Sequence, residues 1–95
     1  MKRFENKIVL VTGAGRGIGA SIAKRFASEG AEVIVNYSGN DEAAQKTVDE
    51  ITAIGGQAQK YKCSVNDSES VKVMIDEIIK KFGRIDILVN NAGIT

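Results

Sequence analysis

The sequence predicts an α/β protein in which helices cover both faces of a parallel four-stranded sheet. Two observations lead to this prediction. Apolar runs rich in β-branched residues alternate with amphipathic segments along the whole chain, and glycines stand where several of these segments end. The 95 residues are 43% hydrophobic and 26% charged, which suits one globular domain over residues 1–95.

The first strand and helix lie on either side of a glycine-rich stretch. Residues 7–12 (KIVLVT) form a continuous apolar run, which is typical of a strand buried on both faces. The helix that follows ends at Gly30, a residue suited to a left-handed cap. Its apolar residues recur at helical spacing and are predicted to pack together: Ile18, Ile22, Ala23, Phe26 and Ala27.

Residues 32–37 (EVIVNY) predict a second strand. Asn40 or Asp41 is expected to cap the next helix, because both side chains accept hydrogen bonds from free amides at a helix start. The inner face of this helix is predicted to contain Ala44, Val48 and Ile51, and the helix ends at the glycine pair 55–56.

Residues 57–63 (QAQKYKC) predict a third strand, and its two lysines suit an edge that must not pair further. Asn66 and Glu69 resemble a capping box at the start of a third helix, which Gly83 ends. Residues 86–90 (DILVN) complete the order βαβαβαβ. The inner face of the third helix is predicted to contain Val71, Ile75, Ile78 and Phe82.

This order, joined by right-handed crossovers, places the first two helices on one face of the sheet. If the third helix returns on the other face, the strands take the order 3-2-1-4. That is a three-layer Rossmann-type sheet, half of a doubly wound fold with its switch point. Periodicity alone leaves a flavodoxin-like order open.

The stretch 12–19 (TGAGRGIG) lies where the first strand turns into the first helix. Free amides and the positive end of the helix dipole bind anions there. Gly13 permits the tight turn, Gly17 lets a pyrophosphate approach the backbone, and Gly19 lets the helix pack closely. The stretch therefore predicts a phosphate-binding loop.

The glycines also resemble two other nucleotide-binding patterns. A P-loop requires Gly-Lys-Ser/Thr, and residues 19–21 (GAS) lack the lysine. The alternate glycines 15, 17 and 19 also fit many S-adenosylmethionine methyltransferases. Those usually have an acid before the glycines and another at the end of the second strand, whereas this chain has Thr12 and Asn36. Both alternatives are disfavoured.

Residues 12–19 resemble the TGxxxGxG fingerprint of the short-chain dehydrogenase/reductase family, and residues 90–93 (NNAG) resemble its second motif. The resemblance covers the whole chain. Within the family, the chain is most similar to the amino-terminal half of bacterial 3-oxoacyl-[acyl-carrier-protein] reductases, through residues 83–95 (GRIDILVNNAGIT) and 35–37 (VNY). The resemblance implies a nicotinamide dinucleotide cofactor and an oxidoreductase.

The choice of NADP over NAD follows from charge. An NAD site commonly ends the second strand with Asp or Glu, whereas this strand ends Asn36-Tyr37-Ser38. Arg16 in the glycine loop suits a 2′-phosphate. The resemblance places the adenine at Ser64-Val65, where the family usually has Asp or Asn before Val. The full set of expected cofactor-binding residues is Gly13, Gly15, Arg16, Gly17, Ile18, Gly19, Asn36, Tyr37, Ser38, Ser64, Val65, Asn90, Asn91, Ala92 and Gly93.

The catalytic pattern of the family, a tyrosine with a lysine four residues later, does not occur in this sequence. Asp41 stands four residues after Tyr37, and Val65 four after Tyr61. We therefore expect a truncated dinucleotide-binding domain that has no catalytic residues and no turnover alone. The alternative hypothesis is a self-standing or engineered half-fold without effective cofactor binding.

Charge and composition bear on the remaining function classes. The net charge of +1 is spread along the chain, so neither a nucleic-acid site nor a membrane patch is expected. No metal site is expected, because the chain has no histidine and one cysteine. Cys63 suits the reducing cytoplasm and is interpreted as a packed residue. The fourth strand lacks guarding lysines, so self-association at its edge is expected.

Overall fold

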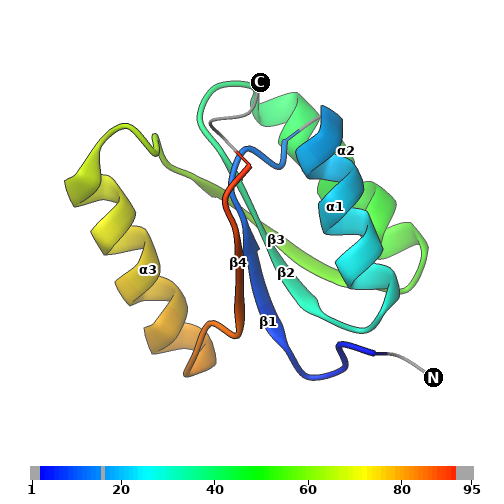
Figure 1. Cartoon of the computed structure of the whole chain (residues 1–95). Coiled ribbons are helices and arrows are strands. Elements are labelled where there is room, and N and C mark those ends of the chain that lie inside the picture. Colours follow the sequence, from blue (N-terminus) through cyan, green and yellow to red (C-terminus); the bar gives the residue numbers. More distant parts are fainter. Residues whose placement is uncertain (1–2, 16, 92–95) are drawn as a thin grey trace.

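The structure is a computed structural model, and it describes residues 3–15 and 17–91. The elements are β1 (Ile8–Val11), α1 (Gly17–Ser28), β2 (Glu32–Tyr37), α2 (Asp41–Ala53), β3 (Gln57–Lys62), α3 (Ser68–Phe82) and β4 (Ile87–Val89). The four strands form one parallel sheet in the order β3-β2-β1-β4. The predicted fold class and strand order are confirmed (Figure 1).

The sheet separates two apolar cores. Successive side chains of a strand point to opposite faces, so Val9 and Val11 of β1 join the core beneath α1 and α2, whereas Leu10 joins the core beneath α3. All three side chains are at most 1% exposed. Figure 1 shows α1 and α2 together on one side of the sheet and α3 alone on the other, as the crossovers predict.

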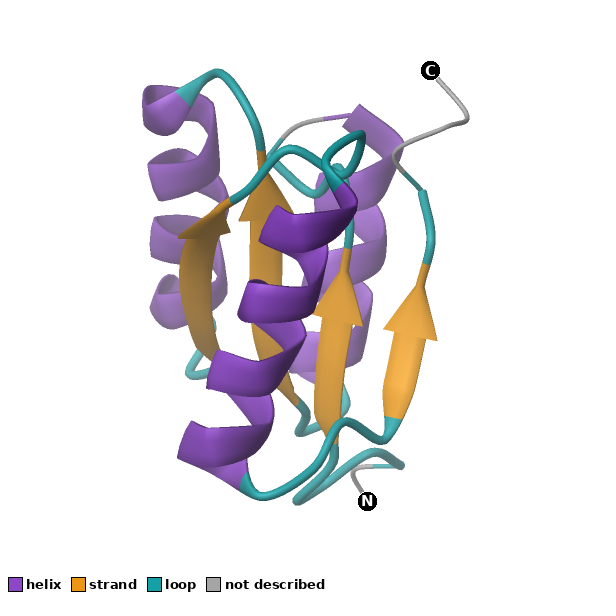
Figure 2. Cartoon of the chain, turned by 90° about the vertical axis from the view of Figure 1, so that its left-hand side faces the viewer, coloured by secondary structure: helices purple, strands orange, loops and turns teal. Residues whose placement is uncertain are grey.

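The single helix on the α3 face covers the middle of the sheet. In Figure 2 α3 lies in front of the central strands, and β4 lies to one side of it. Leu88 of β4 is accordingly 56% exposed, while its neighbour Leu10 in β1 is buried. α3 therefore covers Leu10 of β1 and leaves Leu88 of β4 exposed.

The helix interiors follow the predicted periodicity with two corrections. Ile18 was expected on the packed face of α1 but is 61% exposed in the first turn of the helix. Ala23 and Ala27 carry the buried contact instead, and their small side chains bring the helix close to the strands. In α3, Met74 is fully buried and was missing from the predicted inner face.

The caps of α2 and α3 show how local hydrogen bonding decides a helix start. Asn40 caps α2, and its side chain accepts from the amide of Ala43 at 2.9 Å, as one of the two predicted options. Asp67, rather than Asn66, caps α3 and accepts from the amides of Glu69 and Ser70. The charged carboxylate is the stronger acceptor for helix-start amides, and the helix begins one residue later than expected.

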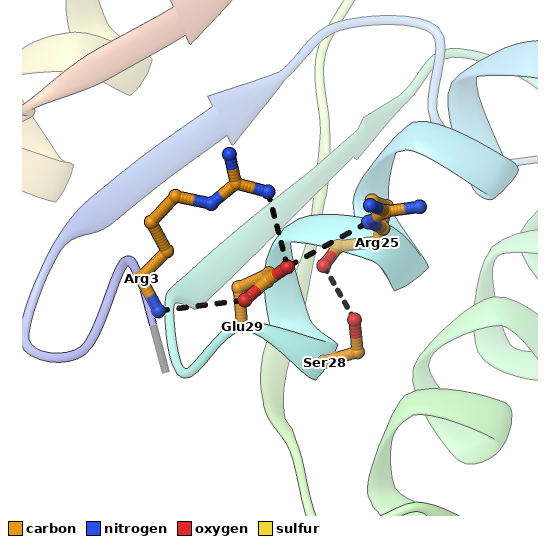
Figure 3. A network of polar contacts seen from close by, with 4 residues as sticks. All are labelled: Arg3, Arg25, Ser28 and Glu29. Carbon is orange, nitrogen blue, oxygen red and sulfur yellow. Dashed lines mark hydrogen bonds and ion pairs between the residues drawn. The ribbon is translucent and has the colours of Figure 1, made fainter. Parts of the chain in front are cut away.

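The residues before β1 are anchored to the carboxyl end of α1 (Figure 3). The Glu29 carboxylate accepts from the Arg3 amide and guanidinium at 3.4 and 3.3 Å, and it pairs with Arg25 at 3.8 Å. The backbone hydrogen bond from Arg3 is the main cause of the lowered pKa of Glu29. The Phe4 ring packs edge-on against Phe26 with ring centroids 5.0 Å apart. These contacts lie near the amino end of β1, whereas the glycine loop lies at its carboxyl end.

None of the helices in the described part of the chain combines the length and the apolar character that crossing a membrane requires.

The start of α1 packs against the loop that precedes it with no room for a side chain. A Cβ atom at Gly19 would lie 2.2 Å from the carbonyl oxygen of Gly13 and 2.9 Å from the Cα of Ala14. Since both atoms belong to the backbone, only movement of the whole helix or loop could relieve the overlap. Gly19 thus fixes how closely α1 approaches the carboxyl end of β1.

We predict that Gly19→Ala destabilises the fold by about 2–3 kcal/mol, because the added methyl group overlaps backbone atoms. Gly39→Ala is the matched control, since a Cβ atom at Gly39 meets nothing within 4 Å. We expect its free energy of unfolding to stay within about 0.5 kcal/mol of the parent. Urea unfolding followed by circular dichroism measures both changes, and equal free energies for the two variants would contradict the close approach.

Candidate functional site

The carboxyl ends of β1, β2 and β3 lie at one edge of the sheet, toward which all the arrows in Figure 2 point. This edge has a topological switch point beside β1. The connection that leaves β1 passes through α1 on one face, while the connection that enters β4 passes through α3 on the other. Open α/β sheets bind ligands at such points.

The backbone of the glycine loop is held by its two neighbouring strands. The Thr12 amide donates to the carbonyl of Val89 in β4 at 3.0 Å. The Ala14 amide donates to the carbonyl of Asn36 in β2 at 2.8 Å. The loop therefore continues the sheet pairing on both sides before the chain turns into α1.

Two buried side chains fix loop carbonyls. The Thr47 hydroxyl of α2 lies 3.0 Å from the carbonyl oxygen of Gly15. The Asn91 amide lies 3.2 Å from the carbonyl oxygen of Gly13 and donates to it. Because protein groups bind these two carbonyl oxygens, the oxygens do not point toward the anion-binding side of the loop. No role for Thr47 was predicted from the sequence, and a hydroxyl on the inner face of a helix is the signal that could have indicated one.

The first turn of α1 is open and free of acidic residues. Gly17 has a φ of 62°, and a Cβ atom there would meet nothing within 4 Å. The first turn of α2, by contrast, carries Asp41 and Glu42. Because free amides and the dipole make a helix start attractive to anions, α1 offers the better phosphate site of the two.

A cleft of about 380 Å³ opens between the glycine loop and the ends of β2 and β3. The predicted residues that line it are Gly13, Gly15, Tyr37, Ser38, Ser64 and Val65. Four further residues line it and were not predicted, namely Gly39, Asn40, Ala43 and Asn66. Gly39, Asn40 and Asn66 lie in the loops that follow β2 and β3, and Ala43 lies in the first turn of α2. Their position just beyond the strand ends is a signal that could have identified them.

The Tyr37 side chain forms one wall of this cleft and is held by Asp41. The Tyr37 hydroxyl donates to one carboxylate oxygen of Asp41, and the Lys60 ammonium binds the other oxygen at 3.0 Å. The hydrogen bond from Tyr37 and then that from Lys60 lower the pKa of Asp41. The same hydrogen bond raises the pKa of Tyr37. The acid nearest the end of β2 is thus ionised and already paired with a cation.

The turn after β3 forms the opposite wall. Ser64 is exposed, and its hydroxyl accepts from the amide of Asn66 at 3.4 Å. Cys63 beside it is buried, and burial is the main cause of the raised pKa of its thiol. The interpretation of Cys63 as a packed residue is confirmed.

Asn36 and Asn91 lie behind the cleft rather than on its surface. Each is 1% exposed, and the described partners of both side chains are protein atoms. The Asn91 side-chain oxygen has no hydrogen-bond partner within residues 3–15 and 17–91. Asn90 is exposed beside them, and its oxygen accepts from the Thr12 hydroxyl at 3.3 Å. The structure brings all three asparagines to the loop, but places two of them as supports.

Three residues of the predicted set, Arg16, Ala92 and Gly93, lie outside the described residues. Within the described residues, no group of three or more metal-ligating side chains gathers.

Comparisons with known proteins agree with this geometry. The family model for short chain dehydrogenases matches residues 7–95. The 3-oxoacyl-[acyl-carrier-protein] reductase FabG of Staphylococcus aureus is 52% identical over 89 residues, which is 94% of this chain and 36% of that protein. The chain therefore spans about a third of the length of this relative.

Two solved structures are similar over nearly the whole chain. A short chain dehydrogenase from Burkholderia cenocepacia in complex with NADP is 46% identical with a TM-score of 0.89, covering 97% of this chain and 38% of that one. A 7α-hydroxysteroid dehydrogenase complexed with NADH and 7-oxo-glycochenodeoxycholic acid is 44% identical with a TM-score of 0.87, covering 94% and 34%. Since the family model matches nearly the whole chain, the protein belongs to the short-chain dehydrogenase family.

Proposed function

We propose that this chain is the NADP(H)-binding portion of a short-chain reductase. The observation that carries the proposal is the cleft, which joins the glycine loop to the ends of β2 and β3. The pyrophosphate would lie over Gly17 at the start of α1, and the adenosine between Tyr37 and the Ser64-Val65 turn. The bound cofactor supplies the hydride, and these residues hold and orient it.

The choice of NADP over NAD is supported by the charges around the cleft. The end of β2 carries no carboxylate, and Asp41 is already paired with Lys60. A 2′-phosphate would therefore meet no free acid there, and Arg16 would supply a guanidinium for it. The two solved structures named above contain NADP in one case and NADH in the other, so relatedness alone supports a nicotinamide dinucleotide.

The reaction that we propose for a longer protein of this kind is hydride transfer from NADPH to a 3-ketoacyl thioester. The support is the 52% identity to the staphylococcal reductase. This chain contains no tyrosine followed by lysine at the fourth position, so it lacks the expected general acid. We also propose a cytoplasmic location, which suits the free thiol of Cys63 and which fractionation of cells would test.

The alternative is a half-fold that assembles or folds without effective cofactor binding. Titrating the chain with NADPH while following nicotinamide fluorescence separates the two functions. Saturable binding supports the proposed function, and the absence of any fluorescence change at millimolar cofactor supports the alternative.

We predict that Gly17→Val abolishes NADPH binding, because a branched side chain would occupy the space over the loop where the pyrophosphate approaches. Gly55→Val is the control for backbone strain, since Gly55 also has a positive φ with open space around it and lies at the opposite edge of the sheet. Calorimetric titration should find parental affinity in the control. Unchanged affinity in Gly17→Val would place the pyrophosphate elsewhere.

Arg16→Ala should weaken the binding of NADPH more than the binding of NADH, because only NADPH has the 2′-phosphate. One charge-assisted contact contributes about 1.5–3 kcal/mol, and less where solvent screens it. Dissociation constants of both cofactors, measured at low and high salt, test this prediction. Equal losses for the two cofactors would remove Arg16 from the 2′-phosphate site.

Mixing the chain with NADPH and a 3-ketoacyl thioester should leave the absorbance of the cofactor unchanged, because this sequence has no tyrosine with a lysine four residues later to protonate the carbonyl. Oxidation that rises with the amount of chain and disappears in Gly17→Val would contradict this expectation.

We also propose that the chain associates with a second copy through β4. The outer edge of β4 carries no lysine, and Leu88 presents an apolar side chain beside it. Leu88→Lys should give a monomer in sedimentation at high micromolar concentration, whereas the parent should sediment as a dimer. Val89 is a poorer position for this charge, because it packs against the core beneath α1. A parent chain that is monomeric at that concentration would refute the association.

A further inference from the structure

Asn36 is a buried amide that the proposed binding mode does not use. It is 1% exposed and lies in β2, between the glycine loop and the end of β3. A polar side chain in such a place must find protein partners, because an unpaired buried amide is destabilising. The partners of Asn36 indicate what it does.

Both ends of the amide are bound, and they bind different walls of the cleft. The side-chain oxygen accepts from the Gly13 amide, with nitrogen and oxygen 3.4 Å apart. The side-chain nitrogen donates toward the carbonyls of Tyr61 and Cys63 at 3.3 and 3.2 Å. Gly13 belongs to the phosphate loop, and Cys63 directly precedes the Ser64-Val65 turn.

The backbone of Asn36 strengthens the same connection. Its carbonyl accepts from the Ala14 amide at 2.8 Å, so one residue binds two successive amides of the loop. The Met74 sulfur lies 3.6 Å from the side-chain nitrogen and closes the site from the α3 side. No other side-chain hydrogen bond described for residues 3–15 and 17–91 joins the glycine loop to the end of β3.

The chemistry of these partners explains why an amide is required. Two carbonyl oxygens need a donor, and the Gly13 amide needs an acceptor. An aspartate would place a carboxylate against two carbonyls, and a leucine would remove both the donor to these carbonyls and the acceptor for the Gly13 amide. Asparagine has two N–H donors and an acceptor on one short side chain.

We propose that Asn36 is a positioning residue that fixes the phosphate loop relative to the turn after β3, so that a dinucleotide meets both walls already in place. The inference rests on the proposed function for its ligand, but its geometric part concerns the chain alone. Preorganisation of this kind improves affinity because binding then orders fewer groups.

The test compares Asn36→Leu with the parent chain by amide hydrogen exchange. Loss of the side-chain acceptor should make the Gly13 amide exchange about tenfold faster, whereas the Ala14 amide keeps its backbone acceptor and should not change. Ile51→Val is the matched control, since Ile51 is fully buried in the core beneath α1 and α2 and its aliphatic side chain makes no hydrogen bonds. Both amides should exchange at the parental rate in the control.

Binding gives the second readout. NADPH spans both walls and should bind Asn36→Leu about tenfold more weakly than the parent. Adenosine alone reaches only the β3 wall, so its affinity should fall less. Equal losses for both ligands, or a parental Gly13 exchange rate, would overturn the proposal. If the leucine variant fails to fold, Asn36→Ala admits water to the three polar groups and should show the same pattern. If the parent fails to bind NADPH, the proposed function fails, while the exchange rates still decide the role of Asn36.

Discussion

The contact between Gly19 and the carbonyl of Gly13 determines the geometry of this end of the molecule. Because no side chain separates them, α1 starts directly against the loop that leaves β1. Its first-turn amides therefore lie at the carboxyl edge of the sheet, close to the ends of β2 and β3. A helix displaced by the width of a methyl group would carry these amides away from the cleft.

The site consists of a surface and a frame with different residue types. The surface contains glycines and small polar residues that leave room at the edge, such as Gly15, Ser38 and Ser64. The frame contains buried groups that bind loop atoms from behind, namely Asn36, Thr47 and Asn91. Mobile surface groups would have to be ordered by a ligand, whereas this frame orders the loop before binding. The same division explains why an asparagine can belong to the site without touching the cofactor.

The sequence predicted the element order and the position of the cleft, and it favoured the observed strand order while leaving a flavodoxin-like order open. Apolar runs and helical spacing determine which faces are buried, and parallel crossovers then determine the sheet. The misplaced details depend on local geometry that periodicity does not contain. Ile18 has the spacing of a core residue but is exposed in the first turn of α1. Asp67 replaces Asn66 as the cap because the carboxylate is the stronger acceptor there.

The roles of Asn36 and Asp41 could not be predicted for a related reason. Each depends on a partner far along the chain, Cys63 or Gly13 for the asparagine and Lys60 for the aspartate. A strand that ends in a polar residue predicts a site residue, but it does not tell whether that side chain points to ligand or protein. The pairing of β2 with β1 brings Gly13 to Asn36, and the pairing of β2 with β3 brings Cys63 to it.

The central claim, that a dinucleotide binds in the cleft above β1, β2 and β3, is tested most directly by amide chemical shifts of the labelled chain during titration with NADPH. We predict saturable changes concentrated at Gly13, Gly17, Ser38 and Val65, with little change on the outer face of α3. Changes that spread evenly over the chain, that centre on α3, or that do not saturate would contradict it.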